Sequence, residues 1–408
     1  MFFEILLFMG GGIALGILTG LLPGLHPNTV FVLVLSLAVF FAGFPVIYTL
    51  VFIIALSVSN VFLDFIPSIL FGAPDPDNCL SVLPGHQMLM DGRGYEAVFL
   101  STIGGLGAMI LTTLTLPILL FAIPGIYSHI HPVIHILLIV VVGWMVWTEQ
   151  GTKKIWALTV FLLAGIFGTI TLNTLPSNLS LFPALTGLFG FSGLIVSFYG
   201  KSKLPEQKKT ARIQTSVVKG TVLGWFAGMI AGLLPGIGSS QAGVVAGQAF
   251  RAKTKDFLTA LGGINAANII FTLVAFYTLG KTRSGAVSAI AQLTPSLSIS
   301  ELTLLMVVAM ATTLVSVILT LKIAGLVITR IHSVSYRKIN LSIIAFLLAA
   351  VVLFTGPLGL MISFSGTLLG IAAIKLGIKR SHMMGFLILP TIIYFSGLTA
   401  GFSHLLGI

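Results

Sequence analysis

Apolar runs of about 20 residues, separated by short polar segments, recur along the whole chain. A run of roughly that length crosses the ~30 Å hydrocarbon core of a bilayer as an α-helix. The pattern predicts an all-α polytopic membrane protein with about 10 transmembrane helices. They are expected at 46–66, 97–121, 131–148, 155–172, 178–199, 257–279, 300–321, 340–356, 358–374 and 383–404.

Two further apolar segments are broken by the same Pro-Gly sequence. "GILTGLLPGLHPNTV" occupies residues 16–30, and most of it returns as "GMIAGLLPGIGSSQA" at residues 228–242. A half-segment of about 15 residues rises only about 22 Å, which is short for a crossing. We therefore expect two re-entrant helical hairpins, at about 5–43 and about 217–250.

The charges agree with a membrane protein. The 408 residues are 57% hydrophobic and 8% charged, whereas soluble domains carry about 25% charged residues. All but three of the 21 basic residues fall into five clusters, which short cytoplasmic loops favour. The clusters are Lys153–Lys154, Lys201–Lys219, Arg251–Lys255, Lys322–Lys338 and Lys375–Arg380. The net charge of +11 thus indicates membrane topology and no nucleic-acid partner.

Five predicted spans follow each hairpin, and an odd number inverts the second copy relative to the first. The chain is therefore predicted to be an inverted-topology repeat in the cell membrane, with both termini outside. The repeats would cover residues 1–200 and 217–408, joined by a basic cytoplasmic linker at 201–219. "SNVFLDFIPSILFG" (59–72) and "ANIIFTLVAFYTLG" (267–280) support the repeat, because each runs from an Asn to a Gly twelve residues later.

The two breaks are the predicted substrate site. Unwound backbone inside a bilayer survives only where protein or water satisfies it, and the N-terminus of a following half-helix favours an anion. Asn, Thr, Ser and Gln after each break can cap that half-helix, and glycines allow a ligand close to the backbone. His26 could sense the protonation state of the substrate or pack in the loop. The candidates are Pro23, Gly24, His26, Asn28, Thr29, Pro235, Gly236, Gly238, Ser239, Ser240 and Gln241.

Other polar residues are candidates for substrate binding or ion coupling, and each has an alternative role. Lys281 and Arg283 are predicted outside, where they form either a fork for a substrate carboxylate or solvated loop charges. Asp64 and Asn60 share a helix face inside a span and are candidates for Na⁺ or H⁺ coupling, although Asp64 could instead be a hydrated structural carboxylate. Asn265 and Asn268 lie near the matching place of the second copy. His129, His131 and His135 have metal-like spacing without a nearby carboxylate, and no metal site is predicted.

The paired "GLLPG" breaks resemble those of the large membrane subunit of tripartite tricarboxylate transporters, the TctA family. The segments "PSILFGAPDPDNCLSVLPGHQMLMDGRGYEA" (67–97), "LFPALTGLFGFSGLI" (181–195) and "HMMGFLILPTIIYFSG" (382–397) are similar to later family segments. Together they cover nearly the whole chain, and "PGLHPNT" is similar to the shorter archaeal members. The resemblance implies a secondary carrier that works with a small membrane subunit and an extracytoplasmic solute-binding protein.

These observations favour a secondary active transporter of a small organic anion, such as a tricarboxylate. The alternative is a translocase for a polyprenyl-phosphate carrier lipid, because the same anion-binding helix N-termini would accept one phosphate. No GxSxG, HExxH or paired-Asp motif occurs in the sequence, so an enzyme is not expected. No cofactor is predicted beyond Na⁺ or H⁺ as a coupling ion.

Overall fold

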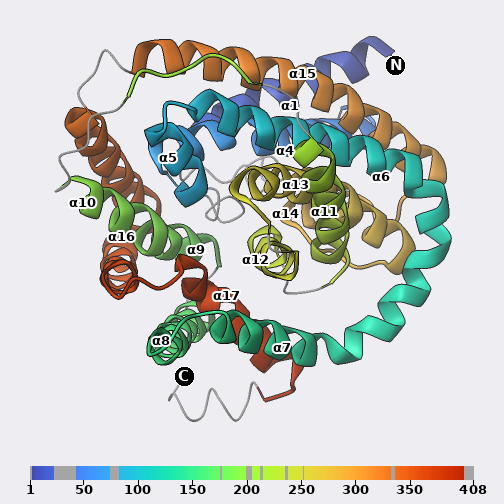
Figure 1. Cartoon of the computed structure of the whole chain (residues 1–408). Helices are drawn as coiled ribbons and strands as arrows, with labels where there is room; N and C mark the ends of the chain where they lie inside the picture. Colours follow the sequence, from blue (N-terminus) through green and yellow to red (C-terminus); the bar gives the residue numbers. More distant parts are fainter. Residues whose placement is uncertain are drawn as a thin grey trace.

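A computed structural model describes the protein over nine segments of the chain, and the description below concerns these residues (Figure 1). They are 2–22, 43–73, 82–174, 177–198, 205–211, 215–234, 238–250, 252–331 and 336–398. Within them every regular element is helical and no strand occurs. The predicted helical class is thereby confirmed.

The elements of the first half of the chain include two π-helical turns, η1 and η3. They are α1 (Phe2–Leu21), α4 (Val46–Leu63), η1 (Pro67–Phe71), α5 (Val82–Met90), α6 (Gly94–Ile130), η2 (His131–Val133), α7 (Ile134–Trp147), α8 (Lys153–Thr174), α9 (Ser177–Leu185), η3 (Thr186–Phe191) and α10 (Ser192–Phe198). The described part of the second half of the chain contains eight further elements. They are α11 (Thr215–Leu233), α12 (Ser239–Ala249), α13 (Thr254–Leu279), α14 (Gly285–Leu293), α15 (Ile299–Ile331), α16 (Tyr336–Lys375), the 3₁₀ helix η4 (Arg380–Met384) and α17 (Gly385–Phe395).

Seven helices of the described residues are long and apolar enough to cross a membrane. They cover Phe2–Leu21, Val46–Phe71, Gly94–Ile130, Lys153–Asn173, Thr254–Leu279, Ile299–Arg330 and Asn340–Lys375. Three shorter apolar helices, Ile134–Trp147, Ser180–Val196 and Val217–Leu233, complete the set. This confirms a multi-pass membrane protein, while the number of crossings, the re-entrant hairpins and the side on which each terminus lies stay predictions.

One turn that the sequence placed between spans is helical in the structure. Residues 122–130, expected as a turn, belong to α6, which contains Pro117 and Pro124. The expected spans 340–356 and 358–374 are the two arms of α16, which meet at a kink. The kink lies at Gly356, whose φ of 64° and ψ of −160° are not helical and are open to glycine and to hardly any other residue. The Gly-Pro pair at 356–357 therefore interrupts the helix where the sequence predicts a boundary.

Helix α1 packs along α4 through glycines at every fourth position. A Cβ placed on Gly12 would lie 2.5 Å from the carbonyl oxygen of Phe52, and one on Gly20 would lie 2.7 Å from that of Asn60. Because residue numbers rise together on both helices, α1 and α4 run parallel. The missing side chains let the two backbones approach closely, which is how membrane helices commonly associate.

Helices α11 and α13 repeat this packing in the same register. A Cβ placed on Gly224 would lie 2.5 Å from the carbonyl oxygen of Ala260, and one on Gly232 would lie 3.1 Å from that of Asn268. A shift of 212 residues carries the α1 glycines onto those of α11, and a shift of 208 carries their α4 partners onto those of α13. The same shift of 208 carries Gly72 onto Gly280, and both are left-handed helix ends, with φ of 67° and 62°. The two helix pairs are therefore structural copies.

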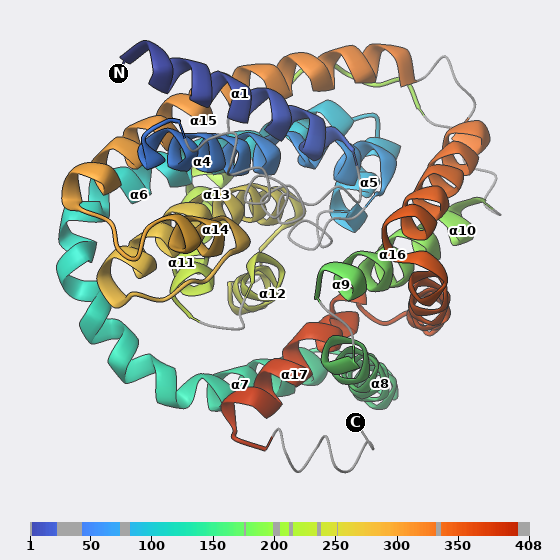
Figure 2. The same ribbon diagram turned by 180° about the vertical axis from the view of Figure 1, so that it is seen from behind.

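The two halves of the chain are interleaved. Helix α13 of the second half packs on α6 of the first half, and α4 of the first half packs on α15 of the second half. Helix α8 likewise packs on α17, and α16 packs on α9 and η3. The long helices α6 and α15 curve around the outside of α11, α13 and α14, as both views show (Figures 1 and 2). This arrangement holds α11–α13 at the centre of the main apolar clusters.

Candidate substrate site at the second helix break

The predicted substrate residues fall partly outside the described residues. Pro23, Gly24, His26, Asn28 and Thr29 of the first break lie outside them, as do Pro235 and Gly236 of the second. Gly238 and the first turn of α12 are described. The geometry of the site is therefore built from the second break and its neighbours.

Helix α12 begins with a cap that the sequence analysis assigned differently. The carbonyl of Gly238 accepts a hydrogen bond of 3.1 Å from the Ala242 N–H, which makes Gly238 the N-cap. The side-chain oxygen of Gln241 accepts a hydrogen bond of 2.9 Å from the Gly238 N–H, as in a capping box. Ser239 and Ser240, expected as caps, lie instead in the first turn, and both are buried.

Ser239 ties this first turn to the middle of α13. The side-chain amide of Asn268 donates a hydrogen bond of 3.3 Å to the Ser239 hydroxyl. Further along, a Cβ on Gly247 would lie 2.7 Å from the ring of Phe257, near the start of α13. Helix α12 therefore runs back antiparallel to α13, from the level of Asn268 to the level of Phe257.

Asn60, the counterpart of Asn268 in the first copy, also binds a hydroxyl. Its side-chain amide donates a hydrogen bond of 3.0 Å to Thr19 Oγ1, near the end of α1. Both side chains are buried. The second copy has Ala231 at the position of Thr19, so Asn268 bonds across the break to α12 instead. The two equivalent amides thus bond to different helices, α1 in the first copy and α12 in the second.

Asp64 ends α4, four residues after Asn60. It is buried, and the hydroxyl of Ser68 lies 3.4 Å from its Oδ1. The shift of 208 places Thr272 at the matching position of α13, where its hydroxyl donates to the Ile269 carbonyl. Asn265, the other ion-coupling candidate, is buried one turn before Asn268. The second copy therefore has no carboxylate at this place, as the sequence indicates.

Arg283 is turned toward α6. Its Nη2 donates a hydrogen bond of 2.8 Å to the hydroxyl of Tyr127, and its guanidinium lies 5.3 Å from the centre of that ring. Lys281 is exposed. Both contacts of Arg283 with Tyr127 are those of a packed residue at the start of α14. Elsewhere in the described segments no three His, Cys, Asp or Glu side chains are close enough to hold a metal ion.

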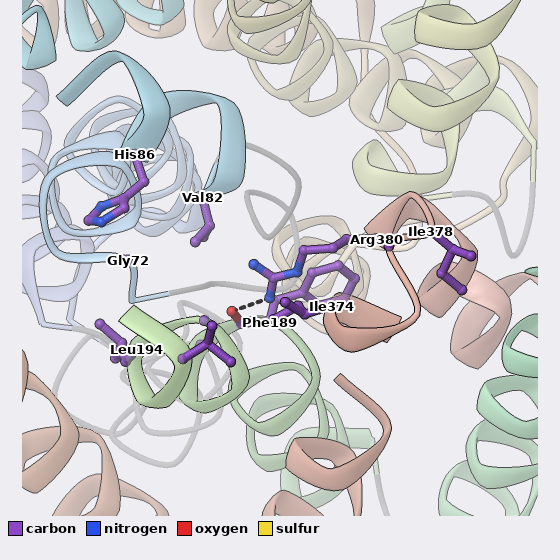
Figure 3. Close-up of a pocket in the computed structure, with 12 residues that line it drawn as sticks. Gly72, Val82, His86, Phe189, Leu194, Ile374, Ile378 and Arg380 are labelled. Carbon is purple, nitrogen blue, oxygen red and sulfur yellow. Dashed lines mark hydrogen bonds between the residues drawn. The ribbon is translucent and has the colours of Figure 1, made fainter. Parts of the chain in front are cut away.

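A cavity of about 430 Å³ lies where η1, α5, η3, α10 and the end of α16 meet (Figure 3). Its lining is mostly apolar or glycine. The lining residues are Gly72, Val82, His86, Phe189, Gly190, Gly193, Leu194, Val196, Ile374, Gly377, Ile378 and Arg380. The sequence analysis counted Arg380 only as part of a cytoplasmic cluster and did not single out His86.

The π-helical turn η3 fixes the guanidinium of Arg380. A π-helix pairs residues five apart, so its junction with an α-helix leaves carbonyls that side chains can bind. Nη2 of Arg380 donates to the carbonyls of Phe189 and Leu188 and, at 3.0 Å, to the hydroxyl of Ser192. In Figure 3 the guanidinium and the side chain of Val82 face each other across the cavity.

His86 lies on another wall of the same cavity. Burial, together with the positive charge of Arg380, lowers the pKa of His86 to about 4. The imidazole is therefore neutral at pH 7, and Arg380 is the only charged side chain among the described residues of the lining. Helix η4, which starts at Arg380, also contacts α12.

The comparisons with known proteins identify the family of the chain. The sequence profile described as "Tripartite tricarboxylate transporter TctA family" matches residues 6–385. The uncharacterized protein MJ1079 of Methanocaldococcus jannaschii is 28% identical over 402 residues, which cover 96% of this chain and 98% of that protein. No solved structure was found to match. Because the profile spans nearly all of the sequence, the chain belongs to the tripartite tricarboxylate transporter TctA family.

Proposed function

We propose that this chain is the membrane permease of a secondary active transporter, and that it binds a small organic anion between two re-entrant hairpins. Family membership supports a transporter and not an enzyme. The observation that supports the proposal for the site is the hydrogen bond between Ser239 and Asn268, because it joins the first turn of α12 to the middle of a membrane-length helix.

Three contacts support the hairpin formed by α11 and α12. Lys219 Nζ lies 3.9 Å from Asp256 Oδ2, so α11 and α13 start together. Gly232, near the end of α11, packs on Phe271, and α13 continues for eight residues beyond it. At 1.5 Å per residue this is roughly 12 Å. Helix α12 then returns to the level of Phe257, so both arms of the hairpin start and end on one side.

The first copy supports the same design. Gly20 of α1 packs on Leu63, and the helical path of α4 and η1 continues for eight residues to Phe71. With the predicted odd number of spans per copy, the two hairpins enter from opposite faces, and rocking one copy against the other gives alternating access. The repeat boundaries at 1–200 and 217–408 belong to this proposal.

The chemistry of the site follows from the half-helix α12. Its first turn directs backbone N–H groups and the positive end of its dipole toward the break, where a carboxylate is stabilised. Asn60 and Asp64 would hold the coupling ion, Na⁺ or H⁺, in the first copy only. The family name implies a tricarboxylate substrate, a small membrane subunit and a solute-binding protein, and these are part of the proposal.

Reconstituted uptake tests the proposal. Proteoliposomes with the full chain should accumulate citrate or a related anion under a Na⁺ or proton gradient, and Asn268→Ala should reduce that uptake at least tenfold. Thr278→Val is the matched control, because the Thr278 hydroxyl donates to the Val274 carbonyl within α13 itself. Flipping of polyprenyl phosphate without anion uptake would favour the carrier-lipid alternative. Equal uptake by Asn268→Ala and Thr278→Val would remove the break from the mechanism.

A further inference from the structure

We propose that a groove between the start of α6 and the last turns of α15 binds one anionic glycerophospholipid, with the lipid phosphate held between Lys209 and Lys322. The groove has a volume of about 450 Å³. None of its described lining residues is a predicted substrate residue, so the inference goes beyond the proposed function and does not depend on it. The described lining consists of Tyr95, Lys209, Leu321, Lys322, Gly325 and Leu326.

The irregular segment 205–211 brings Lys209 to the groove, and it is tied to the turn between α5 and α6. The side-chain oxygen of Gln207 accepts a hydrogen bond of 3.1 Å from the Gly94 N–H. The side-chain amide of Gln207 donates a hydrogen bond of 2.8 Å to the Leu89 carbonyl. The backbone two residues before Lys209 is therefore held by the protein itself.

Lys209 lies across α15 at Gly325. A Cβ placed on Gly325 would lie 3.2 Å from Cε and 3.8 Å from Nζ of Lys209, and 3.8 Å from the ring of Tyr95. The glycine therefore leaves room for the lysine stem beside the tyrosine ring. The segment 205–211 runs along α15 in Figures 1 and 2. Lys322 comes three residues before Gly325, where helical side chains are neighbours, so both ammonium groups lie at the same groove.

Helix α15 places the groove at the edge of the hydrocarbon core. Residues 302–321 contain no charged residue, and their rise of about 30 Å matches the thickness of that core. Lys322 is the next residue and is exposed. Leu314, Ile318 and Leu326 are exposed as well and lie in the same row of the helix, because they are spaced by four residues. An acyl chain along this row would bring its phosphate to the two lysines.

The protein leaves these two ammonium groups available. Within the described segments neither Nζ of Lys209 nor that of Lys322 has a hydrogen-bond or ion-pair partner. Glu96, in the first turn of α6, already forms two ion pairs of 2.8 Å. Glu206, on the same segment as Lys209, is exposed, and the sequence has no Asp or Glu after Glu301. The groove therefore offers an excess of positive charge to a phosphate.

Two lysines at this depth select a lipid with a net negative charge. Lysine binds phosphate as a compact point charge, and juxtamembrane basic residues attract anionic lipids. The amine of a zwitterionic headgroup would bring a further cation close to both lysines, which repel it. A soluble phosphate lacks the hydrocarbon part that would cover Ile318 and Leu326.

Native mass spectrometry of the full chain counts bound lipid directly. Delipidated protein in a nonionic detergent is titrated with phosphatidylglycerol and, separately, with phosphatidylcholine of the same acyl chains. One molecule of phosphatidylglycerol should bind at least about tenfold more tightly than phosphatidylcholine. Glycerol 3-phosphate, which carries the phosphate without acyl chains, should not displace it at equal concentration. Displacement by glycerol 3-phosphate would overturn the lipid site and indicate a site for soluble phosphates.

Substitutions locate the binding. Lys209→Gln and Lys322→Gln should each weaken phosphatidylglycerol binding about tenfold, because a charge-assisted bond to the phosphate is lost. Lys208→Gln is the matched control, since it removes the same charge from an exposed lysine that is not among the described lining. It should weaken binding by no more than about threefold, because salt screens charges outside the groove. Gly325→Leu keeps every charge but fills the groove, so it should also weaken binding.

The outcomes separate a built site from general attraction to a basic surface. Equal losses for Lys208→Gln and Lys209→Gln would indicate general attraction and overturn the site. Equal affinity for the two lipids, or unchanged binding by Gly325→Leu, would overturn it as well. None of these measurements involves transport, so the lipid site and the proposed anion uptake stand or fall separately.

Discussion

The side-chain amide of Asn268, midway along α13, lies 3.3 Å from the hydroxyl of Ser239 at the start of α12. This bond holds the first turn of α12 against the middle of α13. Its counterpart, of 3.0 Å, runs from the Asn60 amide to Thr19 near the end of α1. The equivalent asparagines of α4 and α13 therefore each bond to a neighbouring helix through a hydroxyl.

If the Ser239–Asn268 hydrogen bond stabilises the fold, replacing its donor and replacing its acceptor should have non-additive effects on stability. Ser239→Ala and Asn268→Ala should each lower the free energy of unfolding by about 0.5–1.5 kcal/mol. The double variant should lose about as much as one single variant. Unfolding in graded SDS micelles measures these values. Asn268→Ala combined with Thr278→Val, about 15 Å along α13, should instead be additive. Additive losses for the Ser239 and Asn268 pair would mean that the bond does not couple them.

The glycine contacts between α1 and α4 predict a position-specific effect. A Cβ on Gly16 would collide with the Ser59 hydroxyl and the Leu56 carbonyl, whereas one on Gly10 meets nothing within 4 Å. Gly16→Val should therefore separate the helices and prevent a monodisperse fold, while Gly10→Val should be tolerated. Size-exclusion chromatography of fluorescent fusions distinguishes them. Similar profiles for the two variants would argue against close packing of α1 on α4.

The sequence predicts those features of the fold that require particular residues in the backbone, such as glycine and proline. The Pro-Gly breaks and the Asn-to-Gly spacing are visible because both copies use the same glycine register and the same left-handed helix end. The functional hypothesis at the second break followed from these residues, and the structure places Ser239 and Asn268 in contact there.

The remaining features depend on distant contacts. In the sequence Arg380 is one of a cluster of cytoplasmic charges, whereas in the structure it bonds the carbonyls of Leu188 and Phe189, which lie nearly 200 residues away in the chain. Gln241 is predicted to bind substrate, whereas its side chain bonds the Gly238 N–H. The prolines of α6 resemble loop signals in sequence, because Pro is tolerated inside membrane helices that have packing partners.

Gly356 provides a test of the bend in α16. Its φ of 64° and ψ of −160° lie in a region that is closed to residues with a Cβ. Gly356→Ala should therefore destabilise the protein by about 1–3 kcal/mol. Gly143→Ala, on α7 with open space around it, should be neutral or stabilising by up to about 1 kcal/mol. Thermal unfolding in the same lipid compares them, and equal melting temperatures would contradict a glycine-specific bend.

His382 predicts how stability depends on pH. It is buried in η4, and its Nε2 lies 3.0 Å from Glu149 Oε1 between α7 and α8, while Lys379 donates its backbone N–H to the same carboxylate. Burial holds the pKa of His382 below its usual range, although the Glu149 carboxylate opposes this. Between the usual histidine pKa of about 6.5 and the lowered value, the unfolded chain therefore binds more protons. The contribution of His382 is complete above about pH 6.5 and is lost as the pH falls through the lowered pKa.

Melting temperatures between pH 7.5 and 5 measure this loss. His382→Gln keeps an N–H donor for Glu149 but cannot titrate, so its melting temperature should fall less than that of wild type on acidification. His129→Gln is the control, because His129 is exposed at the end of α6 and should leave the wild-type slope unchanged. Both variants share every other titrating group, including His86, whose lowered pKa acts in the same direction. A His382→Gln slope equal to that of His129→Gln would show that the pair with Glu149 is not the acid-labile contact that joins the two copies.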